Sequence, residues 1–160
     1  MTKEEETLQA AHEELYGRLI TELADAFGVD AAALKETGHL VVGGIDIGLL
    51  NYKMWDQGRI TVFFDLGTIP PARQAEVYRK LLEQNLLLPR TFGTYAIIPG
   101  TDHGALAYTF DIDGLDGYGL AKNICETLTQ YRSLEKSLQD ASESSRLRMG
   151  TSLKSSGIGL

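Results

Sequence analysis

The sequence has very little of what builds crosslinked or membrane-embedded proteins. Its single cysteine, Cys125, rules out an internal disulfide, which suits a reducing compartment. No apolar stretch reaches the roughly 18 residues that a membrane span needs. The acidic start, residues 4–6, provides neither the basic nor the apolar part of a secretion signal. We therefore expect a cytoplasmic protein without a membrane partner.

Positive charge is also scarce. The chain has 15 Lys and Arg residues against 22 Asp and Glu residues, a net charge of −7 and a pI of about 4.9. Segment 146–160 contains Arg146, Arg148 and Lys154 and no acid, so the negative charge belongs to the residues before it. Because phosphate binding needs a positive surface, an acidic body argues against nucleic acid as a partner. It favours solubility or a basic partner.

Signatures of catalysis and of cofactors are missing as well. There is no Gly-x-x-x-x-Gly-Lys phosphate loop and no Gly-x-Ser-x-Gly elbow. The histidines His12, His39 and His103 have no second histidine or cysteine at the spacing of metal ligands. We therefore expect no cofactor, no metal and no enzymatic activity.

One alternative with a metal stays open. Asp111, Asp113 and Asp116 lie close together, and a small metal-dependent enzyme could be built on such a cluster. Asp116 fits better as the cap of a following helix. Cys125 comes within that helix, near its apolar stripe, and we expect it to be buried.

The spacing of apolar residues predicts an α+β fold, in which an antiparallel sheet is flanked by helices. Spacings of three and four indicate helices, and short β-branched and aromatic runs between turn residues indicate strands. Turns are expected at Gly43-Gly44, at 56–58 and at 99–104. The elements expected in order are a helix over 4–27, strands over 40–42, 45–54 and 59–64, a helix from Pro70-Pro71 to Pro89, strands over 93–98 and 105–112, and a last helix from about Asp116.

The domain is expected to end near residue 141. From residue 142 onward the composition shifts to serine, glycine and arginine, which is typical of a disordered segment. We therefore expect a single domain over 1–141 and a basic tail over 142–160.

Several phrases of the sequence resemble the CesT/Tir-chaperone family, the class I chaperones of type III secretion. They occur in the order and at the spacing typical of that family, over roughly residues 8–140. The phrases are Val62-Phe63-Phe64-Asp65-Leu66-Gly67 with Ile69-Pro70, the helix end 81–87, the segment 91–96, Pro99-Gly100, the strand 106–110, and Leu115-Asp116.

This resemblance implies a homodimer that binds the N-terminal segment of a secreted effector in a non-globular form, without ATP. Apolar pockets and strand addition would hold the segment. The same fold would also suit a regulatory protein that sequesters a transcription factor or another chaperone. The residues expected to bind the partner are Leu15, Leu19, Val42, Leu50, Tyr52 and Trp55. The residues expected at the dimer interface are Tyr78, Leu82, Leu106, Tyr108 and Phe110.

Overall fold

The structure of the protein is a computed structural model that describes residues 1–52 and 56–132. The predicted partner-binding residue Trp55 and the predicted tail 142–160 lie outside the described residues. The chain divides into two compact units, Met1–Leu120 and Ala121–Leu160. The first unit contains a five-stranded antiparallel sheet together with helices, so the predicted α+β class is confirmed.

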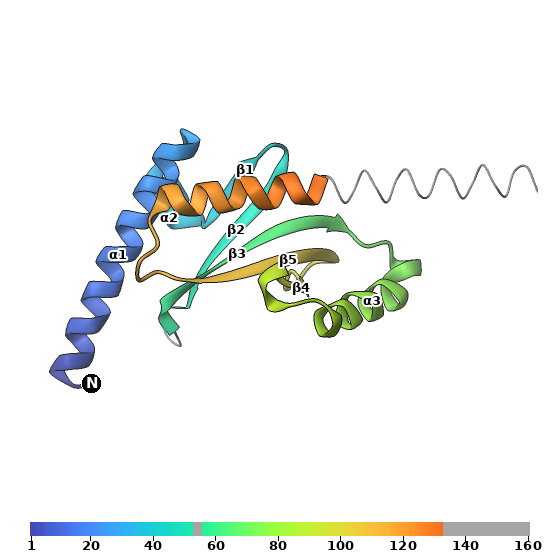
Figure 1. Cartoon of the computed structure of the whole chain (residues 1–160), viewed down its shortest axis with the longest axis horizontal. Coiled ribbons are helices and arrows are strands. Elements are labelled where there is room, and N and C mark those ends of the chain that lie inside the picture. Colours follow the sequence, from blue (N-terminus) through green and yellow to red (C-terminus); the bar gives the residue numbers. More distant parts are fainter. Residues whose placement is uncertain (53–55, 133–160) are drawn as a thin grey trace, which may run out of the picture. The chain divides into compact units, whose positions relative to one another are not determined.

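The first helix, α1 (Lys3–Phe27), which Figure 1 shows at the N-terminus, has capping residues at both ends. Thr2 and Glu5 form a capping box, in which each side chain accepts a hydrogen bond from the backbone N–H of the other residue. Gly28 ends the helix in the left-handed conformation, with a φ of 66°. The buried residues all lie in the second half of the helix: Tyr16, Leu19, Ile20, Leu23 and Ala24.

A short helix and a hairpin follow. Asp30 caps α2 (Ala31–Thr37), and Gly38 ends it. Strands β1 (His39–Val42) and β2 (Ile45–Tyr52) are joined by Gly43 and Gly44, whose φ angles of 59° and 81° confirm the predicted hairpin turn.

The third strand is longer than predicted. β3 runs over Asp56–Thr68, so the turn expected at 56–58 is wrong: these residues belong to the strand. A register shift in the β2–β3 ladder, between Asn51 and Tyr52, allows Tyr52 to pair directly with Asp56. The polar Asp-Gln-Gly sequence therefore lies at a strand end.

The second half of the unit begins at Pro71. A 3-10 turn (Pro71–Arg73) leads into α3 (Gln74–Leu87), and a second 3-10 turn (Arg90–Phe92) leads into strand β4 (Thr94–Ile97). Strand β5 covers His103–Asp111 and starts two residues earlier than predicted, because His103 and Gly104 pair with Thr68 and Gly67 of β3. The strand order is β1-β2-β3-β5-β4, which makes β1 and β4 the outer strands.

The sheet has two different faces. Its inner face carries the core residues of the strands, among them Leu40, Ile47, Leu49, Val62 and Phe64, and α1 contacts β3. The outer face carries the residues that alternate with these core residues along each strand. Register pairs place His39, Gly48 and Phe63 side by side there, and Gly48 contributes backbone only. This outer face and the two outer strands are the parts of the sheet from which a binding site can be built.

The last described helix covers residues 117–132. The side chain of Asp116 accepts from the Gly119 N–H, so the predicted cap is confirmed. Glu22 of α1 accepts from the N–H of Gly117 at 2.8 Å, which fixes the start of the helix. Cys125, within the second unit, is exposed, so its predicted burial is wrong. The buried positions of that segment are Ala121, Ile124 and Leu128 instead.

Candidate functional site

Strand β4, at one edge of the sheet, is contacted by α3, which covers the outward backbone groups of one of its residues. The side-chain amide of Asn85 in α3 donates to the Tyr95 carbonyl at 2.9 Å and accepts from the Tyr95 N–H at 2.7 Å. One side chain thereby occupies both outward backbone groups of Tyr95, which a neighbouring strand would otherwise use at that residue. This is one of the ways in which proteins protect sheet edges.

Strand β1, at the other edge, has no such cover among the described residues. The Leu49 N–H donates to the Gly38 carbonyl at 2.7 Å, so residues 38, 40 and 42 turn their backbone groups toward β2. Backbone groups alternate along an antiparallel strand, and those of Val41 therefore point away from the sheet. The Val41 side chain is also 54% exposed. β1 thus offers an open backbone edge beside an exposed apolar side chain.

A pocket of about 310 Å³ lies next to this edge, on the outer face of the sheet. Phe63 provides much of its floor, because its ring covers Gly48 so closely that any Cβ at that position would collide with it. Leu50, which is 43% exposed, and Ile98 add further apolar lining. The volume is that of a pocket for one side chain or a small ligand.

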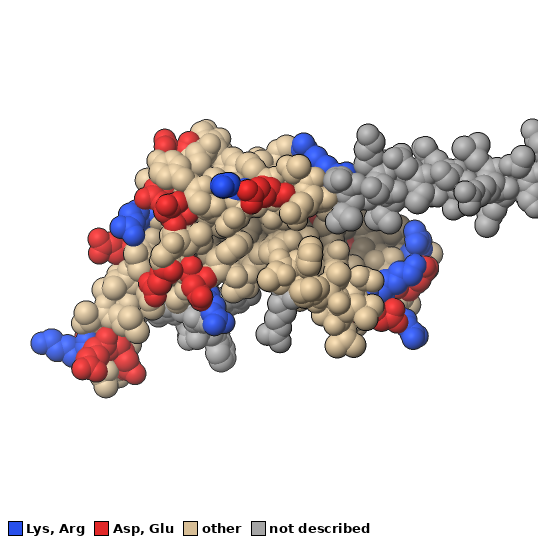
Figure 2. All heavy atoms as spheres, in the orientation of Figure 1, with Lys and Arg blue, Asp and Glu red and all other residues tan. Residues whose placement is uncertain are grey.

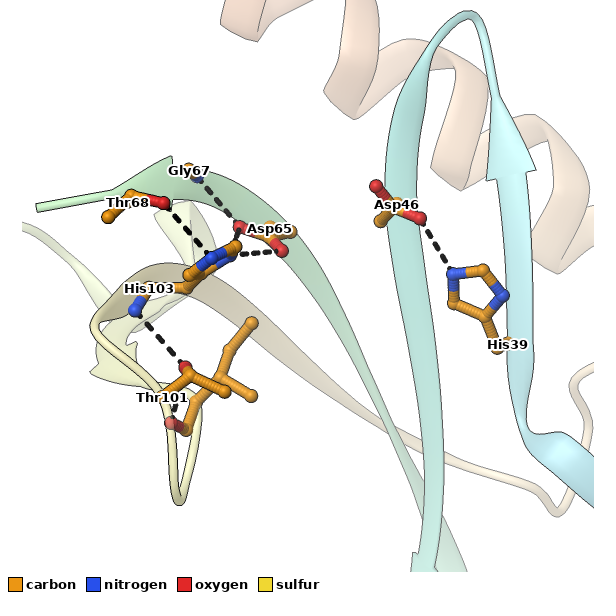
Figure 3. Close-up of polar contacts among 8 residues, drawn as sticks. His39, Asp46, Asp65, Gly67, Thr68, Thr101 and His103 are labelled. Carbon is orange, nitrogen blue, oxygen red and sulfur yellow. Dashed lines mark hydrogen bonds and ion pairs between the residues drawn. The ribbon is translucent and has the colours of Figure 1, made fainter.

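Two histidine–carboxylate pairs border this region, as Figure 3 shows. His39 of β1 contacts Asp46 of β2 at 2.7 Å, and both side chains are more than half exposed. His103 of β5 contacts Asp65 of β3, also at 2.7 Å, and the Asp65 side chain is only 18% exposed. Asp46 and Asp65 both line the pocket, which makes its rim acidic.

The network around Asp65 has a structural role. Asp65 also accepts from the Gly67 N–H at 2.7 Å, and the Thr68 hydroxyl lies 3.1 Å from Nε2 of His103 (Figure 3). A hydroxyl, an imidazole and a carboxylate follow one another here as they do in hydrolases. In this chain they bridge β3 and β5 across the register shift between Asp65 and Gly67 and fix that irregularity.

Helix α3 has no buried residue and carries an exposed apolar surface. In Figure 2, acidic and basic side chains lie close together at the position that α3 has in Figure 1, beside uncharged surface. Leu86 is 87% exposed, and a group of exposed large apolar side chains is typical of an interaction site. We call the following residues the α3 apolar surface: Leu82, Leu86, Leu87, Leu88 and Phe92.

The structure separates the residues that the sequence assigned to partner binding. Leu50 lies on the outer face of the sheet and lines the pocket, whereas Val42 lies on the opposite face. Leu15 is half-buried on α1. Leu19 is only 1% exposed, so it belongs to the core and is not available to a partner in this conformation. The side chain of Tyr52 lies outside the described residues.

The residues assigned to the dimer interface form two groups. Tyr78 and Leu82 are on α3, where Leu82 is 69% exposed. Leu106, Tyr108 and Phe110 share one face of β5, and Tyr108 stacks on Phe110 with ring centres 6.5 Å apart. Leu106 is buried in the core. Leu86 and Leu87, which the prediction did not include, are also strongly exposed on α3, and they belong to a run of three leucines at the end of the helix.

The aspartate cluster does not form a site. Asp111 pairs with Arg59 at 3.2 Å, Asp113 lies 4.0 Å from His12, and Asp116 caps a helix. Within residues 1–52 and 56–132, no three His, Cys, Asp or Glu side chains are grouped so that they could hold a metal ion. None of the helices described is long and apolar enough to cross a membrane.

Comparison with known proteins decides the family. The sequence profile of the Tir chaperone protein (CesT) family matches residues 18–134, which is most of the chain. The chain belongs to this family. The resemblance predicted from the sequence phrases is therefore confirmed. A sequence search of curated proteins gives no match.

Solved structures share the fold of this family member at low sequence identity. A chain of the ExoT–SpcS complex from Pseudomonas aeruginosa is 17% identical, with a TM-score of 0.52, and the match covers 74% of this chain and 96% of that one. A chain of the ExsC–ExsE complex is also 17% identical, with a TM-score of 0.56, and the match covers 72% and 86% of the two chains.

Proposed function

We propose that this chain is a type III secretion chaperone, which binds the N-terminal segment of a secreted effector in a non-globular form without using ATP. Family membership supports this role, and two similar structures, those of ExoT–SpcS and ExsC–ExsE, are complexes of two different proteins. The observation that carries the proposal is the contrast between the edges of the sheet. Asn85 occupies the outward backbone groups of Tyr95 on β4, while β1 leaves those of Val41 open.

An extended effector segment would add to β1 as a sixth strand. Main-chain hydrogen bonds at such an edge provide affinity without requiring one particular sequence, and side-chain pockets beside it provide selectivity. Leu50 and Phe63 on the outer face lie beside the edge and would receive side chains of the added strand. An acidic chain of net charge −7 would also attract a basic segment.

The test is a matched pair of substitutions at Val41 in the full-length protein. Val41→Pro removes the outward N–H from β1, and an outer strand tolerates proline better than a central one does. Val41→Thr keeps the N–H and the branched shape. We expect the N-terminal fragment of the effector encoded beside this gene to copurify with Val41→Thr but not with Val41→Pro. Circular dichroism checks that both variants are folded.

Equal copurification of the fragment with both variants would show that β1 is not the edge that it uses. If no fragment of a neighbouring secreted protein copurifies even with the unmodified chain, the chaperone role itself is wrong.

The homodimer is proposed to form through the α3 apolar surface. Covering a leucine side chain contributes about 1.5–3 kcal/mol, and Leu82, Leu86 and Leu87 are each more than two-thirds exposed in the single chain. Leu86→Asp places a charge in that surface and should give a monomer in sedimentation equilibrium. Gln84→Asp makes the same change in charge on an exposed position of the same helix, and it should leave the dimer intact. A Leu86→Asp variant that stays dimeric would exclude this interface.

A further inference from the structure

The pocket beside β1 combines an apolar floor with an acidic rim. Its floor is formed by Phe63, Leu50 and Ile98, and its rim carries the carboxylates of Asp46 and Asp65. No lysine or arginine contributes to the lining that the structure describes. A side chain that fits both parts has an apolar stem and a cationic head, which is the chemistry of lysine and arginine.

The two carboxylates differ in what they can still bind. Asp65 is only 18% exposed, and it accepts hydrogen bonds from the Gly67 N–H and from His103. Asp46 is 57% exposed and, among the described residues, contacts only His39, through Oδ1. Its second oxygen, Oδ2, is left for an incoming donor. Asp46 is therefore the anchor, while Asp65 adds negative charge that is held in place.

Arginine suits this pocket better than lysine does. A guanidinium group is planar, offers several donors to a carboxylate and packs favourably on aromatic rings, whereas an ammonium group is more strongly hydrated. The ring of Phe63 lies next to the acidic rim. A guanidinium at Asp46 could thus keep contact with an aromatic surface while its stem covers Leu50.

We infer that this pocket binds one arginine side chain of the partner, with its guanidinium at Asp46 and its stem on Phe63 and Leu50. The inference rests on the proposed function, because it supplies a selectivity element for the segment that adds to β1. Val41 and Asp46 are register partners on β1 and β2, so the pocket lies directly inside the open edge. In an added strand, every second residue would face the outer side of the sheet, and one of these would be the arginine.

The pocket can be tested without the effector. The probes are N-acetyl-arginine amide and N-acetyl-citrulline amide. In the citrulline probe, a neutral urea of nearly the same shape replaces the guanidinium group. Each is titrated into the full-length protein and followed by amide proton–nitrogen NMR. A ligand of about 15 non-hydrogen atoms at about 0.3 kcal/mol per atom has a dissociation constant of the order of 1 mM, which this method measures.

We expect the arginine probe to shift the amide signals of residues 46–50 and 63, and to bind at least roughly threefold more tightly than the citrulline probe. Asp46→Asn should weaken the arginine probe roughly three- to fivefold, as expected for an exposed ion pair, and leave the citrulline probe unchanged. Asp102→Asn, which removes an exposed acid outside the pocket lining, is the control and should change neither.

Equal affinities of the two probes, no shift at residues 46–50, or unchanged binding of the arginine probe to Asp46→Asn would each overturn the inference. These outcomes are separate from the proposed function. If the effector fragment copurifies while the arginine probe fails to bind, only the pocket assignment is wrong. If the probe binds at Asp46 and no effector fragment copurifies, the pocket stands and the chaperone role does not.

Discussion

Replacing Asn85 by alanine removes both hydrogen bonds with which α3 covers the edge of β4. The two bonds, 2.9 and 2.7 Å long, are partly buried and join residues ten positions apart. A hydrogen bond of this kind contributes about 1 kcal/mol net, and water replaces part of it at a sheet edge. We therefore expect the free energy of unfolding to fall by about 1–2 kcal/mol, which lowers Tm by roughly 3–6 °C in a chain of this size.

Urea denaturation followed by circular dichroism measures this loss, at one fixed protein concentration because subunit association also stabilises a chain. Gln84→Ala is the control, since it truncates the exposed neighbour on the same helix and should change the free energy of unfolding by less than about 0.5 kcal/mol. The uncovered edge of β4 should also make Asn85→Ala associate more as concentration rises, as seen by light scattering.

An Asn85→Ala variant with the stability of Gln84→Ala would refute the reasoning that the amide holds α3 to β4. A loss of stability without concentration-dependent association would support the two hydrogen bonds as stabilising contacts, but it would contradict their role in protecting the edge of β4 from association.

Three further predictions concern α1 and its neighbours. Gly17→Ala should raise the free energy of unfolding by about 0.5–1 kcal/mol, because Gly17 lies in the middle of the helix and the new Cβ would be 3.8 Å from its nearest atom, Nζ of Lys35. A lower free energy of unfolding in urea denaturation would show that the new methyl group collides with a neighbour. Gly117→Ala should lower the free energy of unfolding by about 1–3 kcal/mol, because the new Cβ would lie 2.5 Å from the backbone nitrogen of Leu23. Unchanged stability would mean that the backbone at Gly117 can move away from Leu23. Burial raises the pKa of Tyr16, so the neutral side chain stabilises the folded chain fully below about pH 10, and this contribution is lost as the pH rises through the raised pKa. In thermal scans, the fall in Tm at high pH should be smaller for Tyr16→Phe than for the unmodified chain. An equal fall in both would contradict this prediction.

The local elements followed from the sequence because their signals are local. The apolar period of α1 with its terminal Gly28, the Gly43-Gly44 hairpin and the β-branched run of β3 are each decided by neighbouring residues. The family could also be predicted, since its phrases occur in order along the chain. The extra length of β3 could not, because Asp56 is a weak strand former that belongs to the strand only through its pairing with Tyr52 of β2.

The candidate binding site could not be predicted in the same way, because it is formed by residues that only the tertiary structure brings together. Alternation along a strand shows which residues share a face, but not which face the helices cover, so Val42 and Leu50 were grouped although they lie on opposite sides. The pair of Asp65 and His103 joins residues 38 apart, and the cover of β4 by Asn85 arises from the packing of a helix on a strand. The sequence by itself determined the elements and the family. Only the packing of those elements decided which edge of the sheet is covered by a helix, because both edges have ordinary strand sequences and differ in their neighbours in space.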